Sequence, residues 1–309
     1  MDAATVDFLV SALRIATPLL FAALGGILSE RAGVFAVGLE GMMLAGAFGA
    51  AIVAFITGSA MLGLVASLAC GACLAGVIAI VTVRFGAEQM VTGLAANIFT
   101  IGLTSFLLRS IVGRGQAPVI QVPLLQAWPV PGLADLPWVG PLLFQQPPLT
   151  YLALLITVPM FYFLMRSQAG LTLRAVGENP QAAYAIGADP MTIRTWAVIA
   201  CGAIAGMGGA VLALQQIGTF TDAMTSGRGY LALAAIIVGR WMPFGTLVAC
   251  LVFGAAEALY LRVQTIGLPI SSYVVQMLPY IIAIFVLALM GRAARLPAAI
   301  GVPYDREAK

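Results

Sequence analysis

Long uninterrupted apolar runs dominate the hydropathy pattern of the chain. They lie at 8–28, 41–57, 62–83, 90–111, 148–165, 195–214, 229–242, 244–261 and 273–290. A membrane-spanning helix needs about 20 predominantly apolar residues, and most of the runs approach this length. The staves of a membrane barrel would alternate apolar and polar residues instead. Inside a bilayer the backbone groups must bond within the segment, so we expect helices. The pattern predicts one all-α membrane domain over residues 1–309, a polytopic bundle of about nine (8–10) transmembrane helices.

Composition supports this class and narrows the chemistry. The chain is 61% hydrophobic and 9% charged, with a mean hydropathy of +1.04, whereas soluble domains carry about 25% charged residues. It has no histidine, and its one lysine is Lys309. The usual residues of nucleophilic, metal-binding and proton-relay chemistry are therefore scarce. We expect no catalytic site and no metal site.

The basic residues predict the orientation of the chain. Positive charge gathers in cytoplasmic connections, and it is concentrated here in the connection 166–194 and in the tail after residue 290. Counting spans from these points places the N-terminus outside and the C-terminus in the cytoplasm. Segment 113–147 is then external. Its many prolines, with Trp128 and Trp138, are typical of a stiff surface loop or of a dock for an external partner.

Two Gly-rich breaks suggest an internal repeat. They lie at Ser29–Gly41 and Gln215–Gly229, each between a full-length apolar run and a shorter one. With one span between the halves 8–111 and 195–290, the two halves enter the membrane in opposite senses. Paired, interrupted segments of this kind are typical of transporters with inverted repeats, and the breaks tend to line the pathway. We therefore predict a pseudo-inverted repeat.

Polar residues within or beside the spans are candidates for the pathway. Glu40 and Arg228 occupy corresponding places in the two breaks, where either helix capping or contact with a solute is open. Asn97 is central in its span and is suited to a solute contact or to a helix–helix hydrogen bond. The candidate pathway residues are Glu40, Met42, Asn97, Arg228 and Tyr230.

Two further intramembrane charges, Arg14 and Glu257, are expected to form structural ion pairs, because buried charges normally face protein or water. Gly202, Gly206 and Ala210 recur every four residues in one span. Such a stripe allows close helix approach, either inside the chain or at a seam between subunits.

The connection 166–194 holds the most specific local signal. Asn179 followed by Pro180 is typical of a helix N-cap with proline at the first helical position, and Gly187 is a natural stop. A helix of about two turns is marginal in water without something to pack against. It suits a surface that inserts into a groove of a partner, although an ordinary capped connector has the same pattern.

This connection resembles the coupling loop of ABC importer permeases for simple sugars and nucleosides. Three other collinear stretches agree, at 28–44, 226–245 and 253–259, and their versions are most similar to the shorter permease subunit of nucleoside importers. The resemblance implies a type II ABC importer-like fold. It also implies contact with a cytoplasmic ATPase through Glu178, Asn179, Pro180, Gln181, Ala182, Ala183, Tyr184, Ala185, Ile186 and Gly187.

The resemblance further implies three partners: a second, homologous permease, a cytoplasmic ABC ATPase, and an external solute-binding lipoprotein, all at the bacterial cytoplasmic (inner) membrane. The sequence has no G-x-x-x-x-G-K-[ST] loop, so ATP and Mg²⁺ are expected on the ATPase and no cofactor on this chain. Import of a pentose or hexose by the same machinery is the alternative function. An ion-coupled secondary transporter is the lesser one, and a membrane enzyme has no supporting motif.

Overall fold

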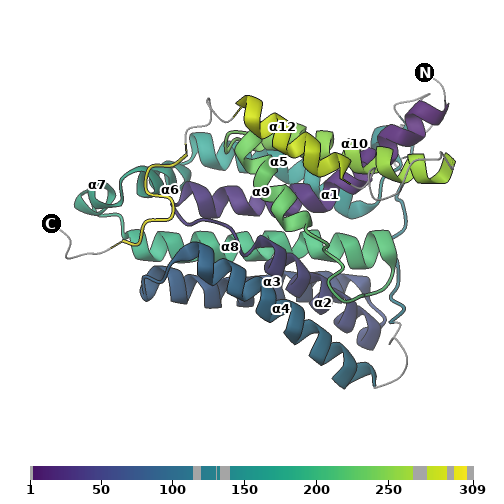
Figure 1. The fold of residues 1–309 in the computed structure, drawn as a ribbon, viewed down its shortest axis with the longest axis horizontal. Coiled ribbons are helices and arrows are strands. Elements are labelled where there is room, and N and C mark those ends of the chain that lie inside the picture. Colours follow the sequence, from purple (N-terminus) through teal and green to yellow (C-terminus); the bar gives the residue numbers. More distant parts are fainter. Residues whose placement is uncertain are drawn as a thin grey trace.

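The computed structural model describes residues 3–113, 120–129, 131–132, 140–266, 277–290 and 296–304. All regular secondary structure in these residues is helical (Figure 1). The helices are α1 (Ala3–Arg31), α2 (Leu39–Thr57), α3 (Ala60–Ala79), α4 (Gln89–Val112), α5 (Pro148–Arg166), α6 (Gln168–Glu178), α7 (Pro180–Ala185), α8 (Pro190–Ala210), α9 (Arg228–Val238), α10 (Pro243–Ile266) and α12 (Leu278–Met290). Short π-helical segments η1 (Ile80–Arg84) and η3 (Val211–Ile217) extend α3 and α8, and η2 (Gly140–Phe144) precedes α5.

The apolar runs correspond to these helices. In the described residues, 7 helices are long and apolar enough to cross a membrane, namely α1, α2, α3 with η1, α4, α5, α8 with η3, and α10. The prediction of a polytopic all-α membrane protein is confirmed. The start of the predicted span 273–290 lies outside the described residues, and its remainder is α12.

The predicted span 229–242 is corrected. Helix α9 has 11 residues and ends at Val238. At about 1.5 Å per residue it covers roughly half of a hydrocarbon core about 30 Å thick. The backbone then turns, with positive φ at Arg240 and Trp241 (56° and 54°). The helix at this place is therefore shorter than the predicted span.

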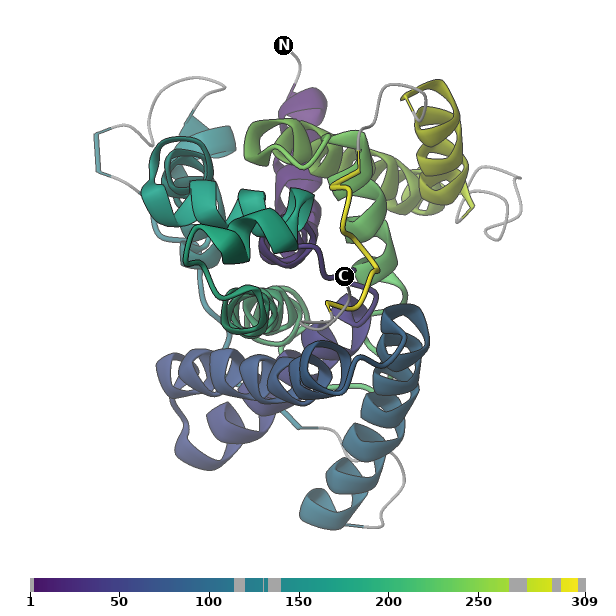
Figure 2. The same ribbon diagram turned by 90° about the vertical axis from the view of Figure 1, so that its left-hand side faces the viewer.

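Helix α8 lies at the centre of the bundle, packed against α1, α2 and α3 (Figure 2). Glycine makes this packing close. A Cβ at Gly202 would overlap the carbonyl oxygen of Gly71 on α3, and one at Gly206 would overlap that of Ser67. The small-residue stripe on this helix therefore packs inside the chain.

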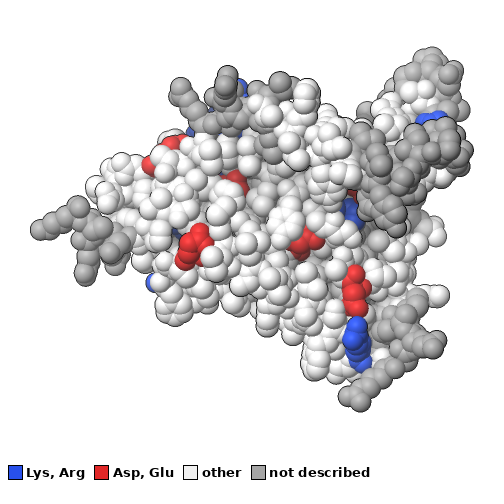
Figure 3. All heavy atoms as spheres, in the orientation of Figure 1, with Lys and Arg blue, Asp and Glu red and all other residues white. Residues whose placement is uncertain are grey.

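Helices α4 and α12 lie on either side of the short α9 (Figures 1 and 2), while α6 and α7 lie together at one end of the bundle. Figure 3 shows that the face in this view is mostly uncharged, with acidic and basic side chains in small separate spots. Exposed apolar residues of α4, including Ile98, Phe99 and Phe106, contribute to the surface. A surface of this kind suits lipid or another membrane protein.

Candidate functional site

The two helix breaks meet in space through one carboxylate. Glu40, in the first turn of α2, is 7% exposed. Its Oε1 accepts a hydrogen bond from the backbone N–H of Gly227 (2.8 Å), and its Oε2 accepts one from that of Gly229 (2.7 Å). A carboxylate at a helix N-terminus satisfies unpaired N–H groups and interacts favourably with the helix dipole. Glu40 thus caps α9 from the other half of the chain.

Close approach explains the glycine after Arg228. A Cβ at Gly229 would lie 2.5 Å from the backbone nitrogen and Cα of Glu40. Real Cβ atoms are not found so close to backbone, so a side chain at position 229 would push the two breaks apart. Glycine at position 229 therefore allows the two breaks to contact each other.

Asn97 of α4 makes the corresponding cap for α2. Its Oδ1 accepts from the N–H of Gly41 (2.8 Å), while its Nδ2 donates to the carbonyl of Val37 (3.0 Å) and to the hydroxyl of Tyr230 (3.0 Å). The side chain is 3% exposed. Asn97 consequently joins α4, the first break and α9 in one network of hydrogen bonds.

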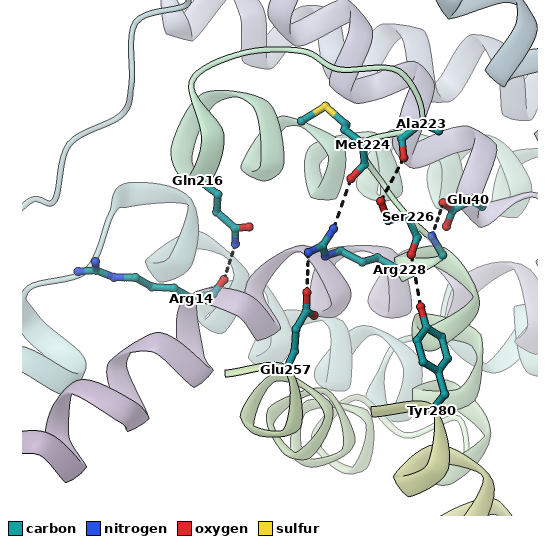
Figure 4. A network of polar contacts seen from close by, with 10 residues as sticks. Arg14, Glu40, Gln216, Ala223, Met224, Ser226, Arg228, Glu257 and Tyr280 are labelled. Carbon is teal, nitrogen blue, oxygen red and sulfur yellow. Dashed lines mark hydrogen bonds and ion pairs between the residues drawn. The ribbon is translucent and has the colours of Figure 1, made fainter. Parts of the chain in front are cut away.

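Arg228 forms an ion pair on the other side of α9. Its Nη2 lies 2.5 Å from Oε1 of Glu257 on α10, and the two side chains are 21% and 18% exposed. Its Nη1 donates to the carbonyl of Met224 (3.3 Å). Figure 4 shows Arg228 between these partners, with Glu40 on the far side of the α9 N-terminus. The expected ion pair of Glu257 is present, with Arg228 as its partner.

A cavity of about 240 Å³ lies beside this ion pair. It is lined by Ser226, Arg228, Leu231, Glu257, Tyr260, Leu261 and Tyr280. The hydroxyl of Tyr280 donates to the carbonyl of Ser226 (3.4 Å), and that of Tyr260 accepts from the amide of Gln264 (2.7 Å). Charged, aromatic and apolar groups from three helices thus converge on one small space.

The remaining candidates are distributed as follows. Tyr230 is 43% exposed and lies with Asn97, whereas Met42 is 2% exposed and packs in the core.

Arg14 forms no ion pair within the described residues, so this expectation is wrong. Its Nε instead donates to Oε1 of Gln146 (2.9 Å), and its carbonyl accepts from the Gln216 side chain (2.7 Å; Figure 4).

The predicted short helix exists as α7; it begins at Pro180 as predicted and ends at Ala185, one residue earlier than predicted. The Asn179 side chain accepts from the N–H of Ala182 (3.0 Å), and Gly187 has a φ of +94°. Only Ala183 of this helix is buried. Tyr184 is 45% exposed and Ile186 is 82% exposed. The helix therefore presents apolar side chains at the end of the molecule.

Two clusters at this end escaped the sequence-based prediction. Glu30, 1% exposed, accepts from the indole N–H of Trp241 (2.5 Å), and the Nε of Arg31 donates to the Trp241 carbonyl (3.2 Å). Arg194, placed by the sequence in a solvated connection, is 2% exposed. The contacts with Trp241 and those of Arg194 join residues more than 100 positions apart, so local sequence carries no signal for them.

The structure defines a class: a multi-pass membrane protein with two interrupted helices that meet in its interior, as transporters have. Comparison with known proteins then identifies the family. Residues 8–290 match the family described as the branched-chain amino acid transport system / permease component. The chain belongs to this family of ABC transporter permeases.

Relatives with curated names cover nearly the whole chain. It is 36% identical over 298 residues to the guanosine ABC transporter permease protein NupQ of Bacillus subtilis (94% of this chain, 93% of NupQ). It is 35% identical over 311 residues to the nucleoside ABC transporter permease protein NupC of Lactococcus lactis (97% of each). It is 38% identical to the putative glucose ABC transporter permease protein TsgC13 of Haloferax volcanii, over 84% of this chain and 78% of TsgC13. No solved structure matches the chain.

Proposed function

We propose that this chain is a permease subunit of an ATP-driven importer of nucleosides and forms the solute pathway together with a second, homologous permease. The observation that carries this proposal is the similarity, over nearly the whole chain, to two nucleoside permeases. The two helix breaks of this chain also meet inside the bundle. Interrupted helices line the pathway in many transporters because their ends expose polar groups. Arg228 and Tyr230 are the proposed lining, and the buried Glu40 and Asn97 would hold the two breaks in place behind it; Met42 packs in the core.

The proposed contact with the ATPase is residues 178–187. Ile186 is 82% exposed at the end of the bundle and offers an apolar side chain that can enter a groove of the ATPase. Helix α7 is short, and its cap and the turn at Gly187 hold its shape before a partner binds. ATP and Mg²⁺ would be bound by the ATPase, and this chain would transmit the movement.

The proposed location is the bacterial cytoplasmic membrane, with the C-terminus and α7 in the cytoplasm and the N-terminus outside. A solute-binding lipoprotein would deliver nucleosides to the outer mouth. The alternating basic connections favour this orientation. A reporter fused to the C-terminus, active only in the cytoplasm, would measure it directly.

The test of coupling is the substitution Ile186→Arg in the assembled complex of two permeases and ATPase. We expect stimulated ATP hydrolysis to fall about tenfold, because a charge replaces an apolar anchor in a partner groove. Ile56→Arg is the matched control, since Ile56 is 66% exposed on the last turn of α2, away from α7. Normal stimulation in the Ile186 variant would reject the assignment of α7.

The test of the solute is uptake by cells that carry the complete complex. We expect labelled guanosine, inosine or uridine to accumulate and to be unaffected by excess ribose or glucose. A simple sugar is the second candidate, because a putative glucose permease is also a relative. Accumulation of a sugar without any nucleoside would favour that candidate, and uptake that persists without the ATPase would reject both.

A further inference from the structure

The cavity beside Arg228 and Glu257 is lined by charged and aromatic side chains that take no part in the hydrogen bonds of Glu40 and Asn97. The hydrogen bonds of Glu40 and Asn97 join α2, α4 and the N-terminal part of α9, whereas this cavity lies between α9, α10 and α12. Its ion pair is neither fully buried nor fully exposed, at 21% and 18%. Figure 4 shows Tyr280 approaching the same backbone segment from the α12 side. The pair is therefore accessible to a small solute.

The polar groups present donors and an acceptor next to each other. Arg228 offers N–H donors, since each terminal nitrogen carries two N–H groups and makes one contact in the structure, with Met224 or Glu257. Glu257 uses Oε1 for the ion pair, and its carboxylate has further acceptor positions. All common nucleobases carry a hydrogen-bond donor beside an acceptor on one edge. An adjacent guanidinium and carboxylate complement that edge.

The apolar groups of the cavity suit a flat ring. Tyr260 and Tyr280 supply aromatic side chains, and Leu231 and Leu261 supply aliphatic ones. Bases stack on aromatic side chains whatever their identity, because every base has a π-face. A simple sugar has no π-face and would pack on these side chains only through its C–H groups.

The size of the cavity fits part of a nucleoside. At about 240 Å³ it is smaller than the roughly 300–1,000 Å³ of pockets that enclose a whole ligand. The rest of the solute would face the space in front of α9, which a second permease would close. The cavity is thus a subsite and not a complete pocket.

We propose that this cavity is a transient subsite for the base of a nucleoside, with the ring stacked on Tyr280 and the base edge hydrogen-bonded to Arg228 and Glu257. The inference rests on the proposed function, since it assigns the base-binding part of the same pathway. It explains how one pathway accepts several nucleosides. The recognised features are those that all bases share.

The first experiment compares Tyr280→Leu with Tyr280→Phe in the complete transporter, reconstituted in liposomes with its binding protein. The measured quantity is the ratio of nucleoside moved to ATP hydrolysed. Leucine removes the ring, so we expect this ratio to fall about tenfold. Phenylalanine keeps the ring and loses only the hydroxyl, so the ratio should stay within about twofold of the wild type.

The second experiment tests the base edge with Glu257→Gln. We expect the ratio to fall about tenfold, because a charged acceptor is lost. Asp222→Asn is the matched control. Asp222 also forms an ion pair, with Arg109 at 3.6 Å, but it is 45% exposed and is not among the cavity residues. This control should keep the wild-type ratio.

Three results would contradict the proposal of a base subsite. Equal loss in both Tyr280 variants would mean that the hydrogen bond to Ser226 matters and not the ring. If uptake and ATP hydrolysis fell together in Tyr280→Leu and Glu257→Gln, the ratio would not change. The cavity would then be a contact surface covered by the second permease and not a site for the solute. Wild-type ratios in both variants would leave the cavity without a role. If the wild-type complex moved no nucleoside at all, the proposed function itself would fail.

Discussion

At the scale of single residues, the sharpest feature is that one carboxylate joins two distant breaks. Glu40 accepts two backbone N–H groups that lie 187 and 189 positions away in sequence. For Glu40→Gln we predict a loss of about 1–3 kcal/mol in the free energy of unfolding, because the amide turns a donor toward one of the two N–H groups. Thermal or denaturant unfolding of the detergent-purified protein would measure it.

Glu88 provides a control of the same chemistry. It caps α4 by accepting from the N–H groups of Met90 (3.0 Å) and Val91 (2.5 Å), but it is exposed. Water can replace these bonds, so Glu88→Gln should cost less, at about 1 kcal/mol or below. Equal losses at the two sites would mean that burial between the breaks adds nothing to the capping of α9.

At the scale of helices, glycine sets how closely α3 and α8 approach. A Cβ at Gly71 would overlap the carbonyl oxygen of Gly202. We predict that Gly71→Ala destabilises the protein by about 1–3 kcal/mol, because backbone must move to admit the methyl group. Gly76 lies on the same helix with nothing within 4 Å of its would-be Cβ, so Gly76→Ala should be neutral or stabilise by up to about 1 kcal/mol. Unfolding of the two variants, measured side by side, checks the two predictions. If Gly76→Ala destabilised the protein as much as Gly71→Ala, the close packing of α3 on α8 would be contradicted.

The helices also show which parts of the fold could be predicted from the sequence. Long apolar runs and the Asn179-Pro180 cap are local signals, and they located the seven long spans and α7. The half-length of α9 was missed because Arg240 and Trp241 adopt positive φ, which residues other than glycine rarely do. Helix α6 was also missed, although the Ser167 side chain caps it by accepting from the N–H of Gly170 (2.9 Å).

The candidate site was predictable only in part, for a physical reason. Intramembrane polar residues stand out because each costs free energy to insert, so Glu40, Asn97 and Arg228 could be selected. Their partners could not, because the hydrogen bonds connect residues more than 50 positions apart along the chain, apart from those of Arg228 to Met224 and Glu257. The cavity beside Glu257 depends on α12, whose position follows from tertiary packing alone.

At the scale of the whole molecule, Arg194 joins the end of the bundle that carries α6 and α7, the proposed coupling end, to the first break. Its Nε donates to the carbonyl of Ala32 (3.1 Å), its Nη1 to that of Val302 (3.0 Å), and its Nη2 to that of Ala299 (3.4 Å). The N–H of Ala299 in turn donates to the carbonyl of Gly177, at the end of α6 (3.0 Å). Movement of α6 and α7 is therefore linked through this guanidinium to the segment before Glu40.

This link makes a prediction for the assembled transporter. Arg194→Gln removes most of the donors, and a lost hydrogen bond to a charged group costs about 1.5–3 kcal/mol. We predict that the variant inserts in the membrane but loses about tenfold in nucleoside uptake per ATP hydrolysed, since the breaks no longer follow the coupling end. Arg84→Gln is the control, because Arg84 is exposed and lines a surface pocket with Asp189 and Thr192 at the start of α8. An Arg194 variant that kept the wild-type ratio would show that force reaches the breaks by another route, such as the contact of Arg31 with the Trp241 carbonyl.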